Sequence, residues 1–260
     1  MTVTAPPADA ALPRERQERI LERLRRHGRV VAADLAVEFR VSEDSIRRDL
    51  RDLAARNLCK RVYGGALLTT AVVPLEERRR EHVDRKRTLA AVAASLVSPR
   101  QILFIDAGST NSAIASALPE RCDLTVVTNA PDVALAVLGR PGFEVLAIGG
   151  RIDPRIGGAI GSMALRQIQG IRADMCFPGV CGADAETGLW TFDPEEVVLK
   201  RAMIEASGET VLVATREKLI TAATHHTAPA GGIAHLVVER TADPALLDAW
   251  RAAGTTVHLA

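Results

Sequence analysis

Apolar and polar positions alternate at helical spacing through the first quarter of the chain. Three segments carry this period, over residues 14–27, 32–39 and 43–56, and each is typical of a short amphipathic helix. Ser42 precedes the third segment as an N-cap, and acidic residues fill the first turn, where they suit the helix dipole. The run LCKRVYGGALL that follows is typical of a β-hairpin that turns at its two glycines. Three helices and a hairpin predict a winged helix-turn-helix.

Beyond residue 86 the pattern changes to short apolar runs that alternate with amphipathic stretches. Strands are expected at 101–105, 124–127, 143–148, 174–177, 209–214, 235–238 and 256–259. Helices are expected at 86–97, 110–118, 131–138, 161–169, 194–207 and 243–253. This alternation predicts an α/β domain with a mostly parallel, mostly buried sheet.

These patterns divide the chain into four parts. Residues 1–13 are rich in Ala and Pro and are expected to be a disordered tail, and residues 14–68 form the winged helix-turn-helix. Residues 69–85 are broken by proline and then densely charged, which is typical of a linker with a solvated helix. Residues 86–260 form the α/β domain.

Charge is distributed unevenly along the chain. The whole sequence has a formal charge of +1, but 14 basic and nine acidic residues between Arg14 and Leu68 give that region +5 and leave −4 for the rest. Such an asymmetry is expected when one part of a protein meets a polyanion, although a solvated helical surface is an equally plain explanation of charge alone.

Cysteine spacing and the amino terminus indicate the compartment. The four cysteines lie far apart, without a C-x-x-C pair or histidines at zinc-ligand spacing, so neither a metal site nor a disulfide is expected. The first residues contain no apolar signal core, and the apolar runs are of strand length. A cytoplasmic protein without a membrane partner is expected.

The third helix carries the candidates for DNA contact. Its arginines fall on the face that the apolar positions leave outside the core, within reach of phosphates and guanine edges. Ser42 and Ser45 stand at the amino end, which enters the major groove in this class of domain, and the basic hairpin forms a wing. An arginine-rich amphipathic helix by itself is more often a plain solvated helix. The predicted DNA-binding residues are Ser42, Ser45, Ile46, Arg47, Arg48, Arg51, Lys60, Arg61 and Tyr63.

Small polar loops follow four strands of the predicted sheet. D-A-G-S-T at 106–110 combines a glycine with hydroxyls at a helix amino terminus, which is an anion site, and T-N-A, G-G and F-P-G-V-C-G follow later strands. Such residues also populate ordinary strand-to-helix turns. Glu196 and Lys200 are spaced to share a helix face, either as a surface pair or as ligands for sugar hydroxyls and a phosphate, and Lys218 offers another cation.

Motifs for turnover are missing from the sequence. It contains no G-x-S-x-G, no P-loop and no G-x-G-x-x-G after a strand, which favours binding over catalysis. The alternative is a sugar-phosphate isomerase with a DNA-binding appendage, in which Asp106 or Glu196 would serve as general base.

Two sets of motifs carry a family resemblance that runs from about residue 14 onward. The motif V-S-x-x-[ST]-I-R-R-D-L, followed by a basic wing that ends in G-G-A, resembles the winged helix of the DeoR family of transcriptional regulators. The second part is similar to its sugar-phosphate sensor domain, in the stretches K-x-x-x-A, D-A-G-S-T, V-T-N, G-G, A-D-x-x-F-x-G, G-L-x-T and E-x-x-x-K-R-x-M. Tyr63 stands where the family has His in the wing, and A-T-R-E-K at 214–218 stands where it has A-D-x-S-K.

The resemblance implies a sensor fold akin to ribose-5-phosphate isomerase that binds phosphorylated sugars without catalysis or a cofactor. The candidate effector contacts are Asp106, Gly108, Ser109, Thr110, Asn129, Gly149, Gly150, Gly179, Glu196, Lys200 and Lys218. We expect a repressor of a carbohydrate operon that leaves its operator when a phosphorylated sugar binds, with an activator as the alternative. Paired half-sites imply a homo-oligomer, a dimer or a tetramer.

Overall fold

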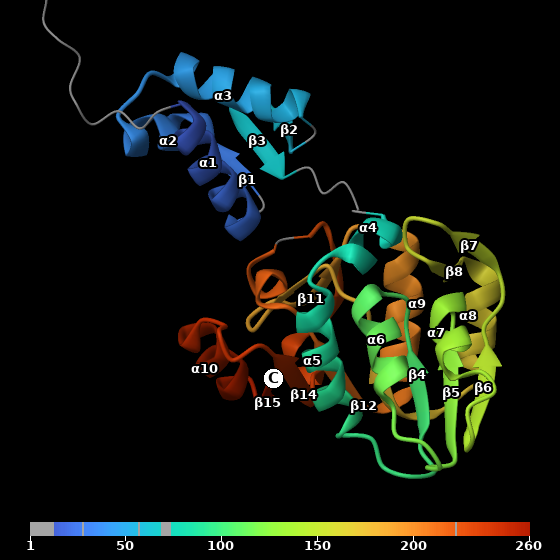
Figure 1. The fold of residues 1–260 in the computed structure, drawn as a ribbon. Helices are drawn as coiled ribbons and strands as arrows, with labels where there is room; N and C mark the ends of the chain where they lie inside the picture. Colours follow the sequence, from blue (N-terminus) through green and yellow to red (C-terminus); the bar gives the residue numbers. More distant parts are fainter. Residues whose placement is uncertain (1–12, 28, 57, 69–73, 222) are drawn as a thin grey trace, which may run out of the picture. The chain divides into compact units, whose positions relative to one another are not determined.

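The computed structural model describes residues 13–27, 29–56, 58–68, 74–221 and 223–260. Contacts divide the chain into two compact units, residues 1–71 and 72–260 (Figure 1). The expected amino-terminal tail lies outside the described residues, apart from Pro13, which opens the first helix.

The first unit is a small helical domain with a three-stranded sheet. Its elements are α1 (Pro13–His27), β1 (Arg29–Val31), α2 (Ala32–Phe39), α3 (Glu43–Ala55), β2 (Cys59–Val62) and β3 (Gly65–Leu68). The strands pair antiparallel in the order β1-β3-β2, so the predicted hairpin gains a short third strand that the sequence pattern did not indicate. Ser42 caps α3 as expected, because its Oγ accepts a hydrogen bond from the backbone N–H of Ser45 at 3.2 Å.

The apolar stripes of the three helices meet in one core. This core contains Ile20 and Leu24 of α1, Phe39 of α2, and Ile46 and Leu50 of α3, all fully or almost fully buried. The helical period of the sequence therefore predicts which faces pack together, because residues three and four apart lie on one side of a helix.

The second unit is built on a seven-stranded sheet. Its strands are β4 (Ile102–Ile105), β5 (Leu124–Thr128), β6 (Phe143–Ala147), β9 (Ala173–Phe177), β12 (Ser207–Val213), β14 (His235–Val238) and β15 (Thr256–Leu259). They run parallel in the order β15-β14-β12-β9-β4-β5-β6. The seven strands expected from the sequence are all present, with ends that differ by at most two residues.

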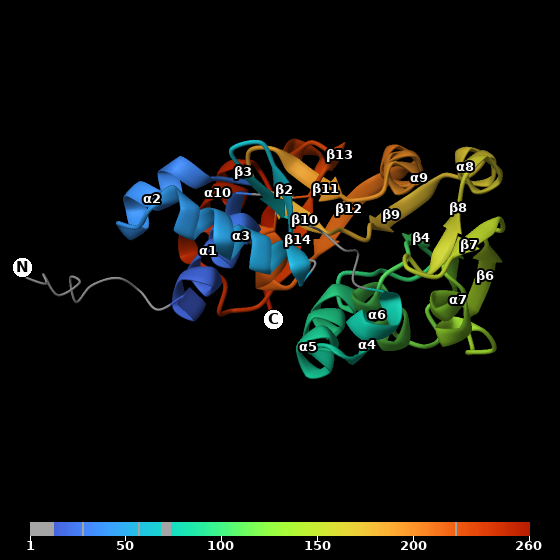
Figure 2. The same cartoon turned by 90° about the horizontal axis from the view of Figure 1, so that it is seen from above.

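Helices cover both faces of this sheet (Figure 1, Figure 2). The covering helices are α5 (Val83–Ala94), α6 (Ser109–Ala117), α7 (Pro131–Val137), α8 (Ser162–Gln169), α9 (Pro194–Glu205) and α10 (Pro244–Ala252). Leu103 and Ile105 of β4 pack with α5, α6 and α7, whereas Phe104 between them packs with α8 and α9. This alternation explains the continuous apolar strands of the sequence, since both faces of each central strand are buried. Helix α5 begins and ends three residues earlier than expected.

Several short elements complete the second unit. They are α4 (Leu75–Arg80), β7 (Arg151–Asp153), β8 (Gly158–Ile160), β10 (Gly182–Asp184), β11 (Gly188–Thr191), β13 (His225–Ala228) and the 3₁₀ turns η1 (Arg216–Ile220) and η2 (Ala230–Gly232). β7 pairs with β8, and β10, β11 and β13 form a separate antiparallel sheet. A solvated helix was expected in the charged linker stretch that holds α4, whereas none of the other short elements was expected. Throughout the described ranges, no helix combines the length and apolar character needed to span a bilayer.

Candidate functional site

A cleft lies where the strand order of the main sheet reverses. From β4 the chain proceeds to β5 and β6 on one side of the sheet, whereas β9, β12, β14 and β15 follow on the other. Loops that leave two such neighbouring strands in opposite directions open a crevice, which is the usual ligand position in parallel α/β sheets. Residues 107–111 after β4 and 178–181 after β9 line this cleft, whose space of about 370 Å³ includes its open mouth.

The loop after β4 presents hydrogen-bond donors to the cleft. Ser109 opens α6, so the amides of its first turn lie beside the hydroxyls of Ser109 and Thr110. A helix amino terminus favours an anion because its N–H groups lack intrahelical partners and its dipole is positive. Asn111 fixes the loop, since its Nδ2 donates to the carbonyl oxygens of Asp106 and Phe177, each at 2.9 Å.

A buried ion pair forms the floor of the cleft. Lys200 is 3 % exposed, and its Nζ lies 2.5 Å from Oδ2 of Asp106 and 3.6 Å from Oε1 of Glu196. The other Glu196 oxygen accepts a hydrogen bond from the Thr191 hydroxyl at 2.5 Å. Burial lowers the pKa of Lys200, but the two carboxylates outweigh it and hold the pKa above its ordinary range. The Lys200 charge is therefore permanent and largely offset by its neighbours.

Gly179 lets the loop after β9 approach this ion pair. Its N–H donates to Oδ2 of Asp106 at 2.8 Å. A Cβ at this position would lie 2.3 Å from the carbonyl oxygen of Ala107 and 3.1 Å from the same Asp106 oxygen. Only glycine therefore fits where the two loops meet.

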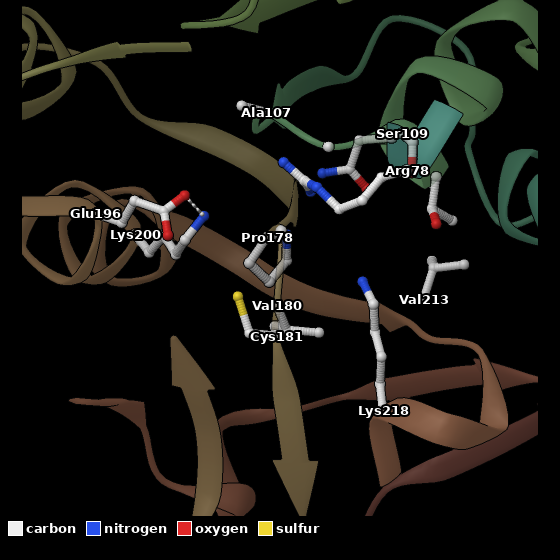
Figure 3. Close-up of a pocket in the computed structure, with 14 residues that line it drawn as sticks. Arg78, Ala107, Ser109, Pro178, Val180, Cys181, Glu196, Lys200, Val213 and Lys218 are labelled. Carbon is white, nitrogen blue, oxygen red and sulfur yellow. Dashed lines mark ion pairs between the residues drawn. The ribbon is translucent and has the colours of Figure 1, made fainter. Parts of the chain in front are cut away.

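Lys218 and Arg78 supply the other cations of the lining, and Figure 3 shows both side chains extending toward the space between the two loops. Burial is the main cause that lowers the pKa of Lys218 to about 8, with Arg78, Lys86 and Lys200 adding and Cys181 opposing. Near neutral pH the Lys218 ammonium is therefore mostly protonated and ready to meet an anion.

The structure brings together most, but not all, of the predicted effector residues. The cleft lining contains Gly108, Ser109, Thr110, Gly179, Glu196, Lys200 and Lys218, and Asp106 lies directly beneath it. Asn129 and the glycines 149 and 150 lie outside the lining. Asn129 exchanges hydrogen bonds with Ala159 of β8, and Gly149 exchanges them with the Gln167 side chain of α8. Asn129 therefore connects the end of β5 to β8, and Gly149 connects the end of β6 to α8.

Sequence reasoning missed several residues of the cleft. Arg78 belongs to the expected linker, and a charge run gives no sign of which arginine turns inward. Asn111 and Cys181 lie within or beside motifs that were quoted, yet neither was selected. No group of three or more His, Cys, Asp or Glu side chains suited to a metal ion occurs in the part of the chain that the structure describes.

Helix α3 presents an arginine face on the first unit. Arg47, Arg48 and Arg51 are exposed, as the helical period predicts. Arg47 is ion-paired within its own helix, at 2.7 Å from Glu43 and 3.5 Å from Asp44. On the wing, Arg61 is exposed and Tyr63 is completely exposed, whereas the Lys60 side chain lies outside the described residues.

Ile46 must be removed from the predicted DNA-binding residues. Its side chain is 0 % exposed and packs in the core with Leu50 and Leu53 on the same helix face. Asp49, which the sequence reasoning passed over, is buried within the arginine run and lies 2.5 Å from Nε of Arg16. This pair connects α3 to α1.

The two units match two family models. Residues 16–72 match the DeoR-like helix-turn-helix domain, and residues 81–240 match the DeoR C-terminal sensor domain. The chain is 36 % identical to the glycerol-3-phosphate regulon repressor of Escherichia coli K12 over 206 residues, which covers 78 % of this chain and 82 % of that protein. It is 31 % identical to a putative aga operon transcriptional repressor of Escherichia coli O157:H7, with 94 % and 93 % covered.

Regulators and isomerases are among the solved structures that align with this chain. The full-length sorbitol operon regulator of Klebsiella pneumoniae aligns with a TM-score of 0.44 at 12 % identity, over 85 % of this chain and 94 % of that one. Ribose 5 phosphate isomerase A of Neisseria gonorrhoeae aligns with a TM-score of 0.38 at 15 % identity, over 52 % of each chain. The two family matches together span most of the sequence, and the chain belongs to the DeoR family of helix-turn-helix regulators with a carboxyl-terminal sensor domain.

Proposed function

We propose that the protein is a transcriptional repressor of carbohydrate or polyol genes, released from operator DNA by a phosphorylated sugar or polyol. The observation that carries the proposal is the cleft at the strand reversal, where the amino terminus of α6 and the Lys218 ammonium converge. The names of the two relatives, both repressors, support the direction of regulation.

The first unit binds the operator through α3 and the wing. Arg48 and Arg51 reach DNA phosphates or base edges, and Arg47 must exchange its carboxylate partners for DNA. Ser42 and Ser45 lie at the amino end of α3, and Arg61 and Tyr63 extend from the wing. Because one short helix reads few bases, the repressor acts as a homo-oligomer on paired half-sites, in the cytoplasm where the operator lies.

The second unit binds the phosphoryl group of the effector in the cleft. The phosphoryl oxygens accept from the first amides of α6 and from the hydroxyls of Ser109 and Thr110, and Lys218 supplies charge. Glu196 and Lys200 stand at the floor of the cleft, where the Glu196 carboxylate retains lone pairs that can accept hydrogen bonds from sugar hydroxyls.

Binding without turnover is the role that these contacts favour. Asp106, one of the two carboxylates considered as a general base, is 2 % exposed and accepts hydrogen bonds from Ala107 N, Gly179 N and Lys200 Nζ. Glu196 is engaged with Thr191 and Lys200. Because donors of the protein already hold both carboxylates, the geometry favours contacts with a ligand over proton transfer from it.

Thermal unfolding of the full-length protein tests the effector assignment. Glycerol 3-phosphate, ribose 5-phosphate and glucose 6-phosphate are compared with glycerol, ribose and glucose. At least one phosphorylated compound is expected to stabilise the protein by about 2.7 kcal/mol at one hundred times its Kd, whereas its parent has no effect. The same compound should release the protein from DNA selected out of a random-sequence pool. Equal stabilisation by parents and phosphates would refute the anion site.

A further inference from the structure

Helix α4 is fastened to the sensor unit beside the cleft. Leu75 is 5 % exposed, and its N–H donates to the carbonyl oxygen of Arg155 at 3.1 Å. The side chain fills a space that exists because residue 157 is glycine, since a Cβ there would lie 2.0 Å from Cδ2 of Leu75. On the other side of α4, Nη2 of Arg79 lies 2.9 Å from Oδ2 of Asp132, the first-turn acid of α7. The helix is therefore held at both sides by the sensor unit.

Arg78 is the residue of α4 that reaches the cleft. Its Nη2 donates to the carbonyl oxygens of Arg155 at 3.0 Å and Ile156 at 3.3 Å, which directs the guanidinium across the opening (Figure 3). In Figure 3 the Arg78 and Lys218 side chains extend into the same space from two different walls, and Ser109 lines that space as well. The two cations therefore come from two walls and face the amino terminus of α6.

Lys86 holds the backbone of α4 in this position. Its side chain is 8 % exposed, and its Nζ donates to the carbonyl oxygen of Arg78 and to that of Glu81 at 2.8 Å. These carbonyls belong to the last turn of α4 and the residue after it, where a lysine satisfies unpaired acceptors and suits the helix dipole. Lys86 thus positions Arg78 without touching the open part of the cleft.

Arg78 adds a positive charge and a planar set of hydrogen-bond donors to the cleft lining. Of the cationic side chains in its described lining, Lys200 is already paired with Asp106 and Glu196. Lys218 and Arg78 bring two further positive charges to this lining, and a guanidinium presents a planar fork that matches phosphoryl oxygens.

We propose that Arg78 is an effector-binding residue that grips the phosphoryl group opposite Lys218, and that Lys86 is its positioning residue. This inference rests on the proposed function. It also gives α4 a regulatory role. In the sequence α4 is the first element of the sensor unit after residues 69–73, which join it to the wing strand β3. A phosphoryl group held by Arg78 thus acts on the sensor element that adjoins the DNA-binding unit along the chain.

Calorimetric titration of the full-length protein with inorganic phosphate and with the three phosphorylated compounds above tests the assignment. Arg78→Gln is expected to weaken the tightest-binding phosphorylated compound by roughly 10- to 100-fold, since a charged hydrogen-bond donor is lost. Arg78→Lys, which keeps the charge but not the fork, is expected to fall between. Lys86→Met is expected to weaken binding by a smaller factor. Arg80→Gln is the matched control, because Arg80 is an exposed arginine of the same helix whose nearest acid, Glu76, lies at 3.8 Å.

Hydrogen exchange of the α4 amides supplies a readout that a purely structural role would not move. Saturating phosphorylated compound should slow exchange over residues 75–82 in the unaltered protein and in Arg80→Gln, but not in Arg78→Gln. Binding by Arg78→Gln within twofold of the unaltered protein, with α4 still protected, overturns the inference and leaves the proposed function standing. If the unaltered protein binds none of the phosphorylated compounds, the proposed function itself fails, and the inference with it.

Discussion

At the scale of single residues, the two lysines of the cleft differ because their surroundings differ. Lys200 is buried against the carboxylates of Asp106 and Glu196, which raise its pKa and form ion pairs with its ammonium group. Burial and neighbouring cations lower the pKa of Lys218 to about 8, so its ammonium group loses its proton at mildly alkaline pH. Both residues carry the same ammonium group, and only the contacts around them raise the pKa of one and lower the pKa of the other.

Effector affinity is predicted to fall as the pH rises from 7 to 9. Lys218 loses its proton with a pKa of about 8 in the free protein, and a bound phosphoryl dianion raises that pKa, so binding takes up a proton in this window. The phosphate monoester itself is already a dianion above about pH 7, because its second pKa is about 6. Titrations at pH 7, 8 and 9 measure the change.

Lys218→Met is the companion variant for the pH series. It should bind weakly at pH 7 and show little further loss by pH 9. A wild-type affinity that stays constant across the window would show that the Lys218 ammonium does not meet the ligand.

The buried pair of Asp49 and Arg16 is predicted to be a stability determinant of the first unit. Their side chains are 3 % and 9 % exposed, and Asp49→Asn takes a negative charge away from the buried guanidinium. Breaking such a pair costs roughly 3–5 kcal/mol of unfolding free energy, which denaturant unfolding at pH 7 measures. Asp52→Asn, on the exposed side of the same helix, is the control and should change the free energy by less than about 0.5 kcal/mol. Similar small values for both variants would contradict a structural role for the buried pair.

At the scale of elements, α3 separates a core face from an arginine face. Ile46, Leu50 and Leu53 are buried, and Arg48 and Arg51 are exposed on the other side. The helical period alone predicts this division, and it also shows why Ile46 cannot serve in DNA contact. Ile46 stands next to the arginines in the sequence motif, whereas in the helix its side chain lies on the core face and theirs lie on the exposed face.

Replacing Arg48 or Arg51 by Ala is predicted to weaken operator binding and its dependence on salt. Each arginine that meets a phosphate contributes about 0.9 to the slope of log affinity against log salt, so each variant should lose close to one unit. Arg47→Ala should lose less affinity, because Arg47 must first give up Glu43. Fluorescence anisotropy from 50 to 300 mM salt checks the order.

The control for this series is Arg23→Ala, which removes one exposed charge from α1 that is paired with Glu38 at 2.8 Å. Its slope should match that of the unaltered protein. Equal slopes for every variant would place the DNA contacts on another surface.

The main elements were accessible from sequence to different degrees. The seven central strands and the three helices of the first unit are encoded by local periods, because each strand or helix buries a face that its own residues define. No such period indicates the hairpin of β7 and β8 or the sheet of β10, β11 and β13, and the charge run of α4 indicates a helix but not its packing. These elements are short and polar in part, and they form because partners distant in sequence cover them.

At the scale of the whole molecule, the proposed regulation couples two sites on two compact units. Thermodynamic linkage then requires reciprocity. The factor by which saturating effector weakens operator affinity must equal the factor by which saturating operator weakens effector affinity, and values of about 5 to 150 are usual for allosteric proteins.

The two factors are measured independently by anisotropy with labelled DNA and by calorimetry with the effector. Arg78→Lys is predicted to reduce both factors if α4 transmits binding, and Arg80→Gln is predicted to change neither. Full coupling in Arg78→Lys at saturating effector would assign transmission to another element.

The sequence by itself determined the order of helices and strands, the separation into a DNA-binding unit and an α/β sensor unit, the arginine face of α3 and the donor-rich loop after β4. Local spacing decides these features, since burial faces and caps depend on residues a few positions apart. Only the tertiary structure decided that the loops after β4 and β9 share one cleft and that Asp106 pairs with Lys200, 94 positions away in the sequence. It also decided that Arg78 and Lys218 line this cleft together, whereas Asn129 donates a hydrogen bond to β8 instead. These outcomes depend on the strand order of the sheet, which is set by the packing of segments that no local period connects.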